Sequence, residues 1–241
     1  HDGLNGSGKG VGATVTSVSL SSDADSVGST GNDLILATAA TLNSGDSLVG
    51  DTGMDTLSLS GSGTFNLNSL TAFSGIERIQ GDSSDQVFQL KDGADLTLST
   101  GSGHNTITTG ASSTQNLQLG SGSNSVTAGA GATQVTTHGG TDVITGGSGA
   151  LNVRAESGIT SIIAGSGGSH IDLGWGKVTL TAGTGVDVID LGHGSGSATV
   201  TSFTQGSDLL AVHAGHVSSY AELLTVATVS STDGNTTISL S

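Results

Sequence analysis

Residues 120–137 read GSGSNSVTA GAGATQVTT, one nine-residue unit followed by another. Each unit begins with Gly-x-Gly and carries an apolar residue, Val126 or Val135, at its seventh position. A nine-residue unit is too short for a helical repeat, but it fits a Gly-rich turn followed by a short strand. Two such units make one 18-residue coil with two strands. The pattern therefore predicts an all-β fold, a parallel β-roll or β-solenoid with two nonapeptides per coil.

The same phase extends along the chain from residue 101 to residue 192, with one inserted residue near Gln115. The first position of the unit is Gly throughout residues 120–192 except at His138 and Glu156. The seventh position is apolar, and its side chains are predicted to point inward as two narrow ladders. These residues are Ile107, Leu117, Val126, Val135, Ile144, Val153, Ile162, Ile171, Leu180 and Ile189. Such ladders allow folding with a core that contains very few aromatic side chains.

Outside this array the pattern changes on both sides. Residues 1–12 are rich in Gly and Ser and are interpreted as a linker or tag remnant, residues 13–98 as irregular coils of the same solenoid, and residues 99–198 as the regular array. Residues 199–241 combine alternating strands with a short helix near residues 220–224, which predicts a C-terminal β cap. Before the array, the apolar spacing wanders through Phe65, Leu67, Phe73, Ile76, Ile79, Val87 and Leu96.

The composition argues against several classes of protein. The chain of 241 residues has 5 Lys and Arg against 20 Asp and Glu, a net charge of −15, and neither Cys nor Pro. So few basic groups argue against nucleic acid as a partner. The missing cysteines exclude disulfide scaffolds and zinc–thiolate sites, and no apolar run approaches the roughly 20 residues of a membrane-spanning helix. Because hydrolase and phosphate-loop motifs are absent, we expect no enzymatic activity.

Two stretches before the array carry a fuller motif. Residues 28–36, GSTGNDLIL, and residues 50–58, GDTGMDTLS, both follow Gly-x-x-Gly-x-Asp-x-apolar. These units resemble the nonapeptides of the RTX (repeats-in-toxin) calcium-binding β-roll family. Residues 200–210 and 234–240 resemble the segment that follows RTX repeats in proteins exported by type I secretion.

Residues 41–48 and 73–79 are similar to parts of large bacterial surface and S-layer proteins with RTX-like repeats. The resemblance implies calcium (Ca2+) as the cofactor, held in the Gly-rich turns by Asp carboxylates and turn carbonyls. It also implies a secreted protein, extracellular or on the surface of a Gram-negative bacterium after type I secretion. In this family the activity usually resides in other domains.

The candidate calcium ligands are acidic residues of the predicted turns. Calcium binds six to eight oxygens with several charges among them, and most array positions equivalent to the motif Asp are Asn, Ser, Thr, Leu or Val. We therefore expect calcium around the two fuller motifs and few or no ions between residues 101 and 180. Neutral residues such as Asn105 and Asn124 are interpreted as turn formers that hydrogen-bond the local backbone. The candidate ligands are Asp33, Asp46, Asp51, Asp55, Asp142 and Asp187.

A second candidate site lies on one outer face of the array. Positions 18 apart place Arg154, Asp172 and Asp190 in one column, continued by Asp208 if the register persists, and His170 flanks Asp172. Arg154 is expected to pair with Asp172, whereas two stacked aspartates require a cation or a proton between them. The possible ligand patch of Arg154, His170, Asp172 and Asp190 is either a site for a cation or carbohydrate or a solvated face with one weak ion pair.

Three functions are compatible with these features. The favoured one is a secreted, non-enzymatic structural or surface protein of S-layer or adhesin type, partly stabilised by calcium. The alternatives are a C-terminal RTX accessory and secretion module of a larger secreted enzyme, and a carbohydrate-active β-helix that uses the Arg154 face. The surface-like stretches favour the first, and the scarcity of basic and aromatic side chains argues against the third. Besides calcium ions, the expected partners are a second copy of the chain or a cell-surface polysaccharide.

Overall fold

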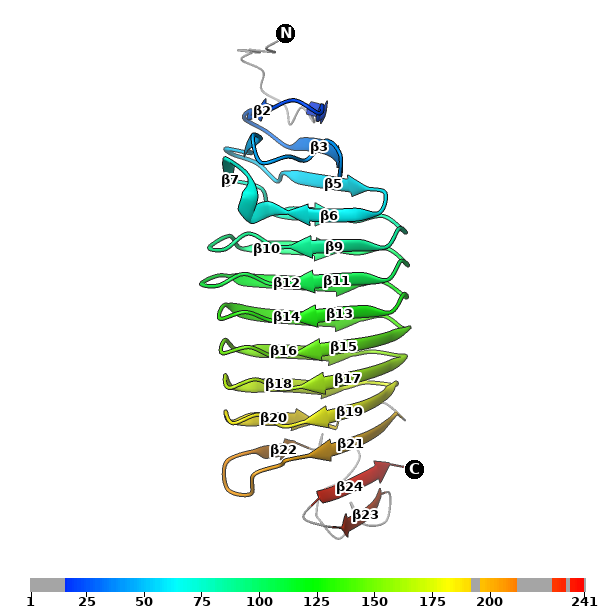
Figure 1. The fold of residues 1–241 in the computed structure, drawn as a ribbon. Helices are drawn as coiled ribbons and strands as arrows, with labels where there is room; N and C mark the ends of the chain where they lie inside the picture. Colours follow the sequence, from blue (N-terminus) through cyan, green and yellow to red (C-terminus); the bar gives the residue numbers. More distant parts are fainter. Residues whose placement is uncertain (1–15, 192–195, 212–226, 233–234, 241) are drawn as a thin grey trace.

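The computed structural model describes residues 16–191, 196–211, 227–232 and 235–240. In these residues the chain winds into a stack of flat coils, and the strands of successive coils form two long sheets (Figure 1). Among the described residues, all strand pairs within the stack are parallel, and antiparallel pairing occurs only at β23 (Ala227–Thr232) and β24 (Asn235–Leu240), which close one sheet at its C-terminal end. The predicted β-solenoid with a C-terminal β cap is confirmed.

The two long sheets take alternate strands of the chain. Sheet A has eleven strands and sheet B has ten, of which the last two are β24 and β23. In order, the strands of sheet A are β1 (Thr16–Ser19), β3 (Asp33–Thr38), β5 (Thr56–Ser60), β8 (Arg78–Gln80), β10 (Leu96–Ser99), β12 (Thr114–Leu119), β14 (Ala132–Thr137), β16 (Leu151–Ala155), β18 (Ser169–Leu173), β20 (Asp187–Asp190) and β22 (Leu209–Ala211). Those of sheet B before the cap are β6 (Gly63–Asn66), β9 (Gln86–Gln89), β11 (Asn105–Thr108), β13 (Asn124–Thr127), β15 (Thr141–Thr145), β17 (Ile159–Ile163), β19 (Lys177–Thr181) and β21 (Ser197–Thr201).

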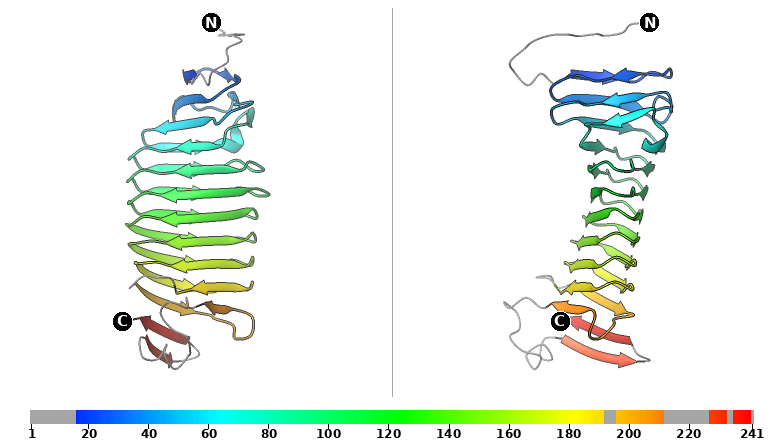
Figure 2. Two further views of the ribbon diagram at one scale, coloured as in Figure 1. Left: turned by 180° about the vertical axis from the view of Figure 1, so that it is seen from behind. Right: turned by 90° about the vertical axis from the view of Figure 1, so that its left-hand side faces the viewer.

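A third, short sheet widens the N-terminal end of the stack (Figure 2, right). It consists of β2 (Ser26–Val27), β4 (Ser47–Val49) and β7 (Ala72–Ser74), and a 3-10 helix, η1 (Leu67–Ser69), precedes β7. The coil of β5, β6 and β7 therefore visits three strands, whereas the coils before it, with β1 and β2 or with β3 and β4, visit two strands each, as the coils of the array do.

Coil length changes in steps along the solenoid: Thr16 pairs with Asp33, 17 residues on, the next coils are longer, and the last ones lengthen again, with Lys177 paired to Ser197 and Val188 to Leu209. In the N-terminal coils, Asp55 and Glu77 stand one above the other at a sequence separation of 22. The separation falls to 19 between Asn105 and Asn124, which lie on either side of the insertion, and to 18 between Asn124 and Asp142. The predicted 18-residue coil therefore holds from the insertion near residue 115 as far as β19 and β20, and the irregular spacing before the array reflects coils of other lengths in the same solenoid.

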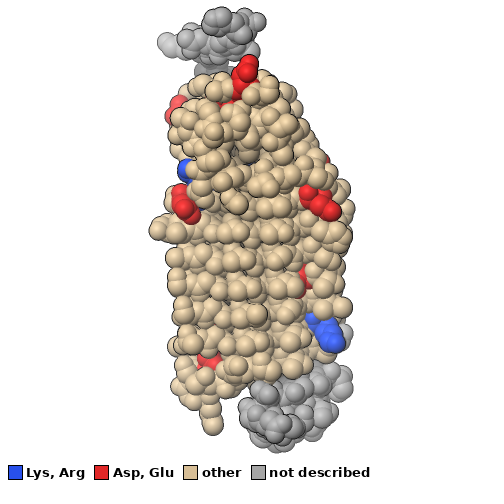
Figure 3. All heavy atoms as spheres, in the orientation of Figure 1, with Lys and Arg blue, Asp and Glu red and all other residues tan. Residues whose placement is uncertain are grey.

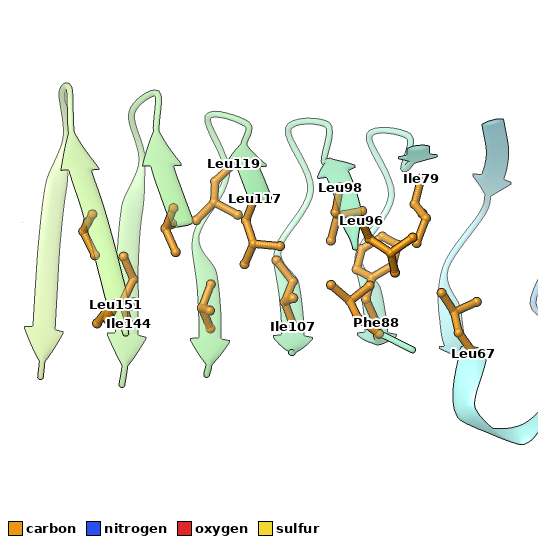
Figure 4. Close-up of a cluster of buried hydrophobic side chains, with 14 of the residues drawn as sticks. Leu67, Ile79, Phe88, Leu96, Leu98, Ile107, Leu117, Leu119, Ile144 and Leu151 are labelled. Carbon is orange, nitrogen blue, oxygen red and sulfur yellow. The ribbon is translucent and has the colours of Figure 1, made fainter. Parts of the chain in front are cut away.

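The core is a narrow stack of apolar side chains between the two sheets (Figure 4). Every residue predicted for the inward ladders of the array, from Ile107 to Ile189, is buried. One residue of the irregular region was assigned to the wrong face. Phe88 is buried and stacks on Phe65 with ring centroids 5.8 Å apart, whereas its neighbour Val87 faces outward and is only half-buried.

Strands of the array carry more inward residues than the single apolar position of the nonapeptide predicted. In β16, Leu151, Val153 and Ala155 all point inward, so one strand contributes three core residues in place of one. The motif Asp position is consequently the first inward residue of a strand, at the point where the turn ends. This placement explains why Leu151 can occupy it, since the position belongs to the core.

The turns stack as closely as the strands do, which requires glycine. A Cβ on Gly165 would collide with the carbonyl oxygen of Gly147 in the preceding coil, and a Cβ on Gly183 would collide with that of Gly165. Any larger residue here would push adjacent coils apart. The spacing of glycines therefore follows from backbone contact between neighbouring turns.

The C-terminal cap continues sheet B. Ala198 pairs with Ile238, so β24 extends the sheet from β21 in the antiparallel sense. These strands confirm the predicted extended segments of the cap, while the linker expected at residues 1–12 and the helix expected near residues 220–224 lie outside the described residues. Within the described part of the chain, no helix is long and apolar enough to cross a membrane.

Candidate functional site

The motif Asp position forms one ladder along each long sheet, where a turn becomes a strand. Pairing in register carries the ladder from coil to coil, so its members lie above one another. On sheet A the members are Asp33, Asp55, Glu77, Leu96, Gln115, Thr133, Leu151, Ser169, Asp187 and Asp208. On sheet B they are Gln86, Asn105, Asn124, Asp142, Thr160 and Val178. Acids occupy both ends of the sheet A ladder, and neutral residues fill its middle.

At the C-terminal end of sheet A, each carboxylate holds two backbone amides. Asp187 accepts the N–H of Ser169 at Oδ1 (3.1 Å) and the N–H of Gly183 at Oδ2 (2.8 Å). Asp208 repeats the pattern with the N–H groups of Asp187 (3.1 Å) and Thr204 (2.7 Å). One oxygen therefore joins two coils and the other closes the residue's own turn. Both oxygens of each acid have partners within the chain, so these acids hold neighbouring backbone segments together.

Two of the N-terminal acids are satisfied in a similar way. Asp46 accepts the N–H of Asp25 at Oδ1 and the N–H of Asn43 at Oδ2, both at 2.9 Å. Asp33 accepts the hydroxyl of Ser29 at distances of 2.6 and 2.7 Å from its two oxygens. Both side chains are buried. Each of them stabilises a turn of the chain without requiring a ligand.

Asp55 departs from this pattern. Its Oδ1 accepts the N–H of Asp33 (2.6 Å), and its own N–H donates to Oε2 of Glu77 (2.9 Å). Its Oδ2 has no hydrogen-bond partner among the residues that the structure describes, although Asp55 is 0% exposed. A Cβ on Gly50 would collide with both this Oδ2 and the carbonyl oxygen of Gly75, so the two oxygens lie against the same glycine. A buried oxygen without a donor thus faces a backbone carbonyl.

The surroundings of Asp55 are strongly acidic. Burial raises the pKa of Asp55, the N–H of Asp33 lowers it, and the nearby carboxylates of Asp33, Glu77 and Asp51 raise it further. Asp51 follows β4, whereas Asp46 precedes it, so the structure brings together Asp33, Asp51 and Asp55 of the predicted ligands and leaves Asp46 on the short sheet. Glu77, which the sequence analysis did not single out, completes the group.

These acidic residues could hold a cation only with help from other oxygens. No three His, Asp or Glu side chains in the described residues converge closely enough to hold a metal ion by themselves. An ion at Asp55 therefore needs backbone carbonyl groups, such as that of Gly75, and water among its ligands. Carboxylate and carbonyl oxygens with water are the ligands that calcium takes in proteins, so the residues at Asp55 fit this ion.

In the regular array, amides replace the acids. Asn105 donates from Nδ2 to Oδ1 of Asn124 (2.9 Å), and Asn124 donates from Nδ2 to Oδ1 of Asp142 (2.8 Å). Both amides also donate to their own turns, at the carbonyl oxygens of Gly103 (3.0 Å) and Gly122 (3.2 Å). The interpretation of these asparagines as residues that hydrogen-bond the local backbone is confirmed, and they link coils as well.

Asp142 ends this chain of amides. Burial raises the pKa of Asp142 to about 6, although two hydrogen bonds from Asn124 favour the ionised form. Its Oδ2 has no partner, and the next residue along the ladder is the neutral Thr160. Asp142 therefore differs from Asp55 because no second carboxylate stands beside it in the ladder. A proton on the carboxyl group of Asp142 is therefore sufficient to remove its buried charge.

A third cluster lies at the turns that lead from sheet A to sheet B. Arg154 Nε is 3.4 Å from Oε1 of Glu156 and 4.0 Å from Oδ2 of Asp172, and His138 Nε2 is 3.7 Å from Oε2 of Glu156. Trp175, 65% exposed, lies one coil further and donates its backbone N–H to the carbonyl oxygen of Glu156 (2.9 Å). The ion pairs are exposed, so each contributes under about 1 kcal/mol to stability.

The predicted ligand patch is assembled in part. Arg154 pairs in register with Asp172, and Asp172 with Asp190, as the 18-residue step required. His170 is exposed beside Asp172 on the same face of β18. The predicted ion pair between Arg154 and Asp172 is present, but Glu156 approaches the guanidinium more closely.

The column does not continue to Asp208. Asp190 pairs with Ala211, whereas Asp208 follows Asp187 in the inward ladder. The reason is the longer last coil, because Asp187 and Asp208 stack at a sequence separation of 21, compared with 18 for Ser169 and Asp187. The expectation that Asp208 joins the outer column is therefore wrong.

Three residues of these sites were missed as functional candidates. His138 and Glu156 stand where the repeat has Gly, and this substitution in two neighbouring coils of sheet A was the available signal. Glu77 follows Asp55 at a sequence separation of 22, the same separation at which Asp55 follows Asp33. A search at the period of the longer coils would have found it.

The fold defines the class of this protein, a parallel β-solenoid with acidic turns at its ends. No protein-family model matches the chain, and no curated protein or solved structure is significantly similar to it. The function is therefore argued from the geometry of the acidic turns and of the two outer faces.

Proposed function

We propose that this chain is a non-enzymatic structural rod of a secreted surface protein, of adhesin or S-layer type, whose N-terminal coils are stabilised by calcium. The observation that carries the proposal is Oδ2 of Asp55, a buried carboxylate oxygen without a donor among the acids Asp33, Asp51 and Glu77. A protein that buries such a group usually satisfies it with a proton, a water molecule or a cation.

A divalent cation suits Asp55 better than a proton does. Protonation would neutralise only the carboxylate of Asp55 and leave the negative charges of Asp33, Asp51 and Glu77 around it. A calcium ion would neutralise two charges and attract the remaining ones, and its flexible coordination accepts carbonyl oxygens and water. The nearby carbonyl of Gly75 supplies an oxygen of this kind.

The proposed extracellular location follows from the strength expected of this site. With one inward carboxylate and ligands from the backbone, the site resembles weak calcium sites with dissociation constants of about 10⁻⁴–10⁻³ M. Such a site is filled at the millimolar calcium concentrations outside cells and empty at cytosolic ones. Secretion through a type I system, with delivery to the surface of a Gram-negative bacterium, agrees with this dependence and with the RTX-like sequence motifs.

The structural role is supported by the form of the molecule. The chain forms two long parallel sheets with a continuous core, and the inward acids of the C-terminal coils accept hydrogen bonds from the backbone. Sheet B turns a face toward the viewer of Figure 3 that carries few charged side chains, mostly near its edges. An elongated rod with flat sides suits a spacer or lattice element, and it offers extended faces for self-association.

Thermal unfolding with and without calcium tests the proposal. At 10 mM calcium and a dissociation constant of about 10⁻³ M, bound calcium adds about 1.4 kcal/mol, which raises the melting temperature by about 3–6 °C. Asp55→Asn should abolish this increase without lowering the melting temperature measured in chelator.

Asp187→Asn is the matched control. It removes an inward carboxylate whose two oxygens hold Ser169 and Gly183, so it should lower the melting temperature equally with and without calcium. An unchanged melting temperature of the unmodified chain in calcium, or a full calcium effect in Asp55→Asn, would contradict the proposal.

A further inference from the structure

The outer face of sheet A between β10 and β18 is polar at every position of its two outward rows. Register places these side chains in two parallel columns, each with one residue per coil. The first column is Thr97, Asn116, Gln134, Asn152 and His170, and the second is Ser99, Gln118, Thr136, Arg154 and Asp172. We call these ten residues the amide face, because Asn and Gln occupy its centre.

The opposite face, on sheet B, has a different character. Its two outward columns contain short hydroxyl side chains interrupted by Val143 and Ile163, which are 43% and 47% exposed. The two faces belong to the same coils and have the same backbone. The coils are therefore stable without long polar side chains on the outer face of sheet B, so coil stability alone does not explain those on sheet A.

Amide side chains in register commonly bond to one another along a stack of strands. On the amide face, the amides of Gln118 and Asn116 share a hydrogen bond within one strand (3.0 Å). The side chains of Gln134 and Asn152, although stacked in register, make no hydrogen bond to each other or to any other described residue. Their donors and acceptors are directed to the surroundings of the protein, so the column is not a stabilising ladder.

The corner of this face holds the single Trp of the chain. Trp175 is 65% exposed, and the turn it occupies packs on that of Glu156, next to Arg154 and Asp172. An exposed indole offers an apolar plane beside polar groups that accept and donate hydrogen bonds. Sparse aromatic groups argued against a sugar site at the level of composition, but the fold gathers this one with the polar columns.

From this juxtaposition we infer that the amide face, with Trp175 at its edge, binds a neutral, extended polysaccharide that lies along the axis of the solenoid. Coils repeat at about 4.8 Å, which is close to the length of one pyranose residue in an extended glycan. Successive sugar units would therefore meet equivalent amide groups on successive coils. The indole would stack on a pyranose ring, and Arg154 and Asp172 would bond to its hydroxyl groups.

The chemistry of the face selects this partner over others. A protein interface usually has an apolar or aromatic centre with a polar rim, and the amide face has the reverse arrangement. Nucleic acid needs clustered basic groups, whereas Arg154 shares its charge with Glu156 and Asp172. Amide groups suit the hydroxyl groups of neutral sugars, because they donate and accept hydrogen bonds equally.

Affinity electrophoresis of the full chain tests the inference, with gels that contain xyloglucan, mixed-linkage β-glucan or galactomannan as probes. We expect at least one of these neutral glycans to retard the chain. Trp175→Ala and the double change Gln134→Ala and Asn152→Ala should each weaken binding about tenfold or more. All three side chains are exposed, so folding is retained, and circular dichroism melts of each variant verify this.

Ile163→Ala is the matched control, because it removes an exposed apolar side chain from sheet B and should leave retardation unchanged. Measurements in calcium and in chelator separate this inference from the calcium proposal, since the amide face lies in the array and should bind in both. The inference would be overturned by no retardation in any neutral glycan, by equal retardation of the variants, or by retardation only in a gel with anionic alginate, which would indicate a charge site at Arg154. Retention of the chain by a protein partner through the amide face would overturn it as well.

Discussion

The N-terminal coils, residues 16–80, and the regular array, which begins at residue 99, stack their strands in the same way but fill the motif Asp position with different chemistry. In the N-terminal coils this position holds Asp33, Asp55 and Glu77 in three consecutive coils. In the array it holds mainly amides, hydroxyl groups and apolar residues. An amide both donates and accepts hydrogen bonds, whereas an ionised carboxylate only accepts them. Amides in a ladder can therefore bond to one another, while a ladder of acids depends on backbone N–H groups, protons or cations.

The amide ladder of the array leaves one buried oxygen without a partner among the described residues at each end, Oδ1 of Asn105 and Oδ2 of Asp142. Asn105 and Asn124 each donate one hydrogen bond to the next coil, and this series of bonds ends at Asp142. One carboxylate oxygen then lacks a donor, as at Asp55. The difference lies in the neighbours, because Asp55 stands among other acids and Asp142 beside Thr160. We therefore expect the two regions to respond to different conditions, calcium in the first and pH in the second.

The largest expected effect concerns the core of the array. Ile144→Asp places an unpaired charge at a position that is 0% exposed, and it should destabilise the fold by more than about 4 kcal/mol. Because the array is held by apolar ladders and amides, calcium should not rescue this variant. Circular dichroism melts in calcium and in chelator measure both statements.

Asn124→Ala provides the comparison for that variant. It removes a buried amide and its bonds to Asn105 and Asp142, at a cost of about 1–3 kcal/mol, and the chain should stay folded. If Asn124→Ala were as damaging as Ile144→Asp, and only in the presence of calcium, the array would depend on metal ions in the same way as the N-terminal coils.

A smaller effect is expected from Asp142 and is seen as a dependence on pH. The pKa of this group rises from 3.8 to about 6 on folding, so folding favours its protonated form. The associated stability, about 3 kcal/mol, is fully present below pH 3.8 and is lost as the pH rises through 6. Asp142→Asn should therefore stabilise the chain at pH 8 by up to about 3 kcal/mol and have little effect at pH 4.

Urea titrations at the two pH values measure this change. Asp172→Asn is the control, because the side chain is exposed and its ion pair with Arg154 contributes under about 1 kcal/mol. A destabilised Asp142→Asn at pH 8 would mean that the carboxylate is needed in its ionised form, as expected of a cation ligand.

The smallest effect compares the two regions directly. Removal of calcium should speed amide hydrogen exchange about tenfold in β3 and β5, which corresponds to about 1.4 kcal/mol. Exchange in β14 and β16 of the array should not change. Equal acceleration in both regions would show that calcium acts on the whole solenoid and that Asp55 is not the dominant site.

Much of the fold was predictable because the length of the repeat sets the length of a coil and its apolar position sets which side chains point inward. A nine-residue step with an apolar seventh position allowed the inward residues from Ile107 to Ile189 to be predicted correctly. The same step put Arg154, Asp172 and Asp190 in one column. It failed where the coil length changes, at Val87 before the array and at Asp208 after it, because an odd number of added residues moves each following side chain to the other face of a strand.

The sequence by itself determined the class of fold, the core ladders and the region in which acids accumulate, since these depend on periodicity and composition. Only the tertiary structure decided which acids have their oxygens occupied by the backbone. Asp46 and Asp187 occupy predicted ligand positions like that of Asp55, but the N–H groups they accept come from another coil and from the preceding turn. The structure also gathered Trp175, Arg154 and the amides of β12–β16 on neighbouring coils, because stacking makes residues 18 apart nearest neighbours. Contacts between coils are set by three-dimensional register, which a linear motif does not contain.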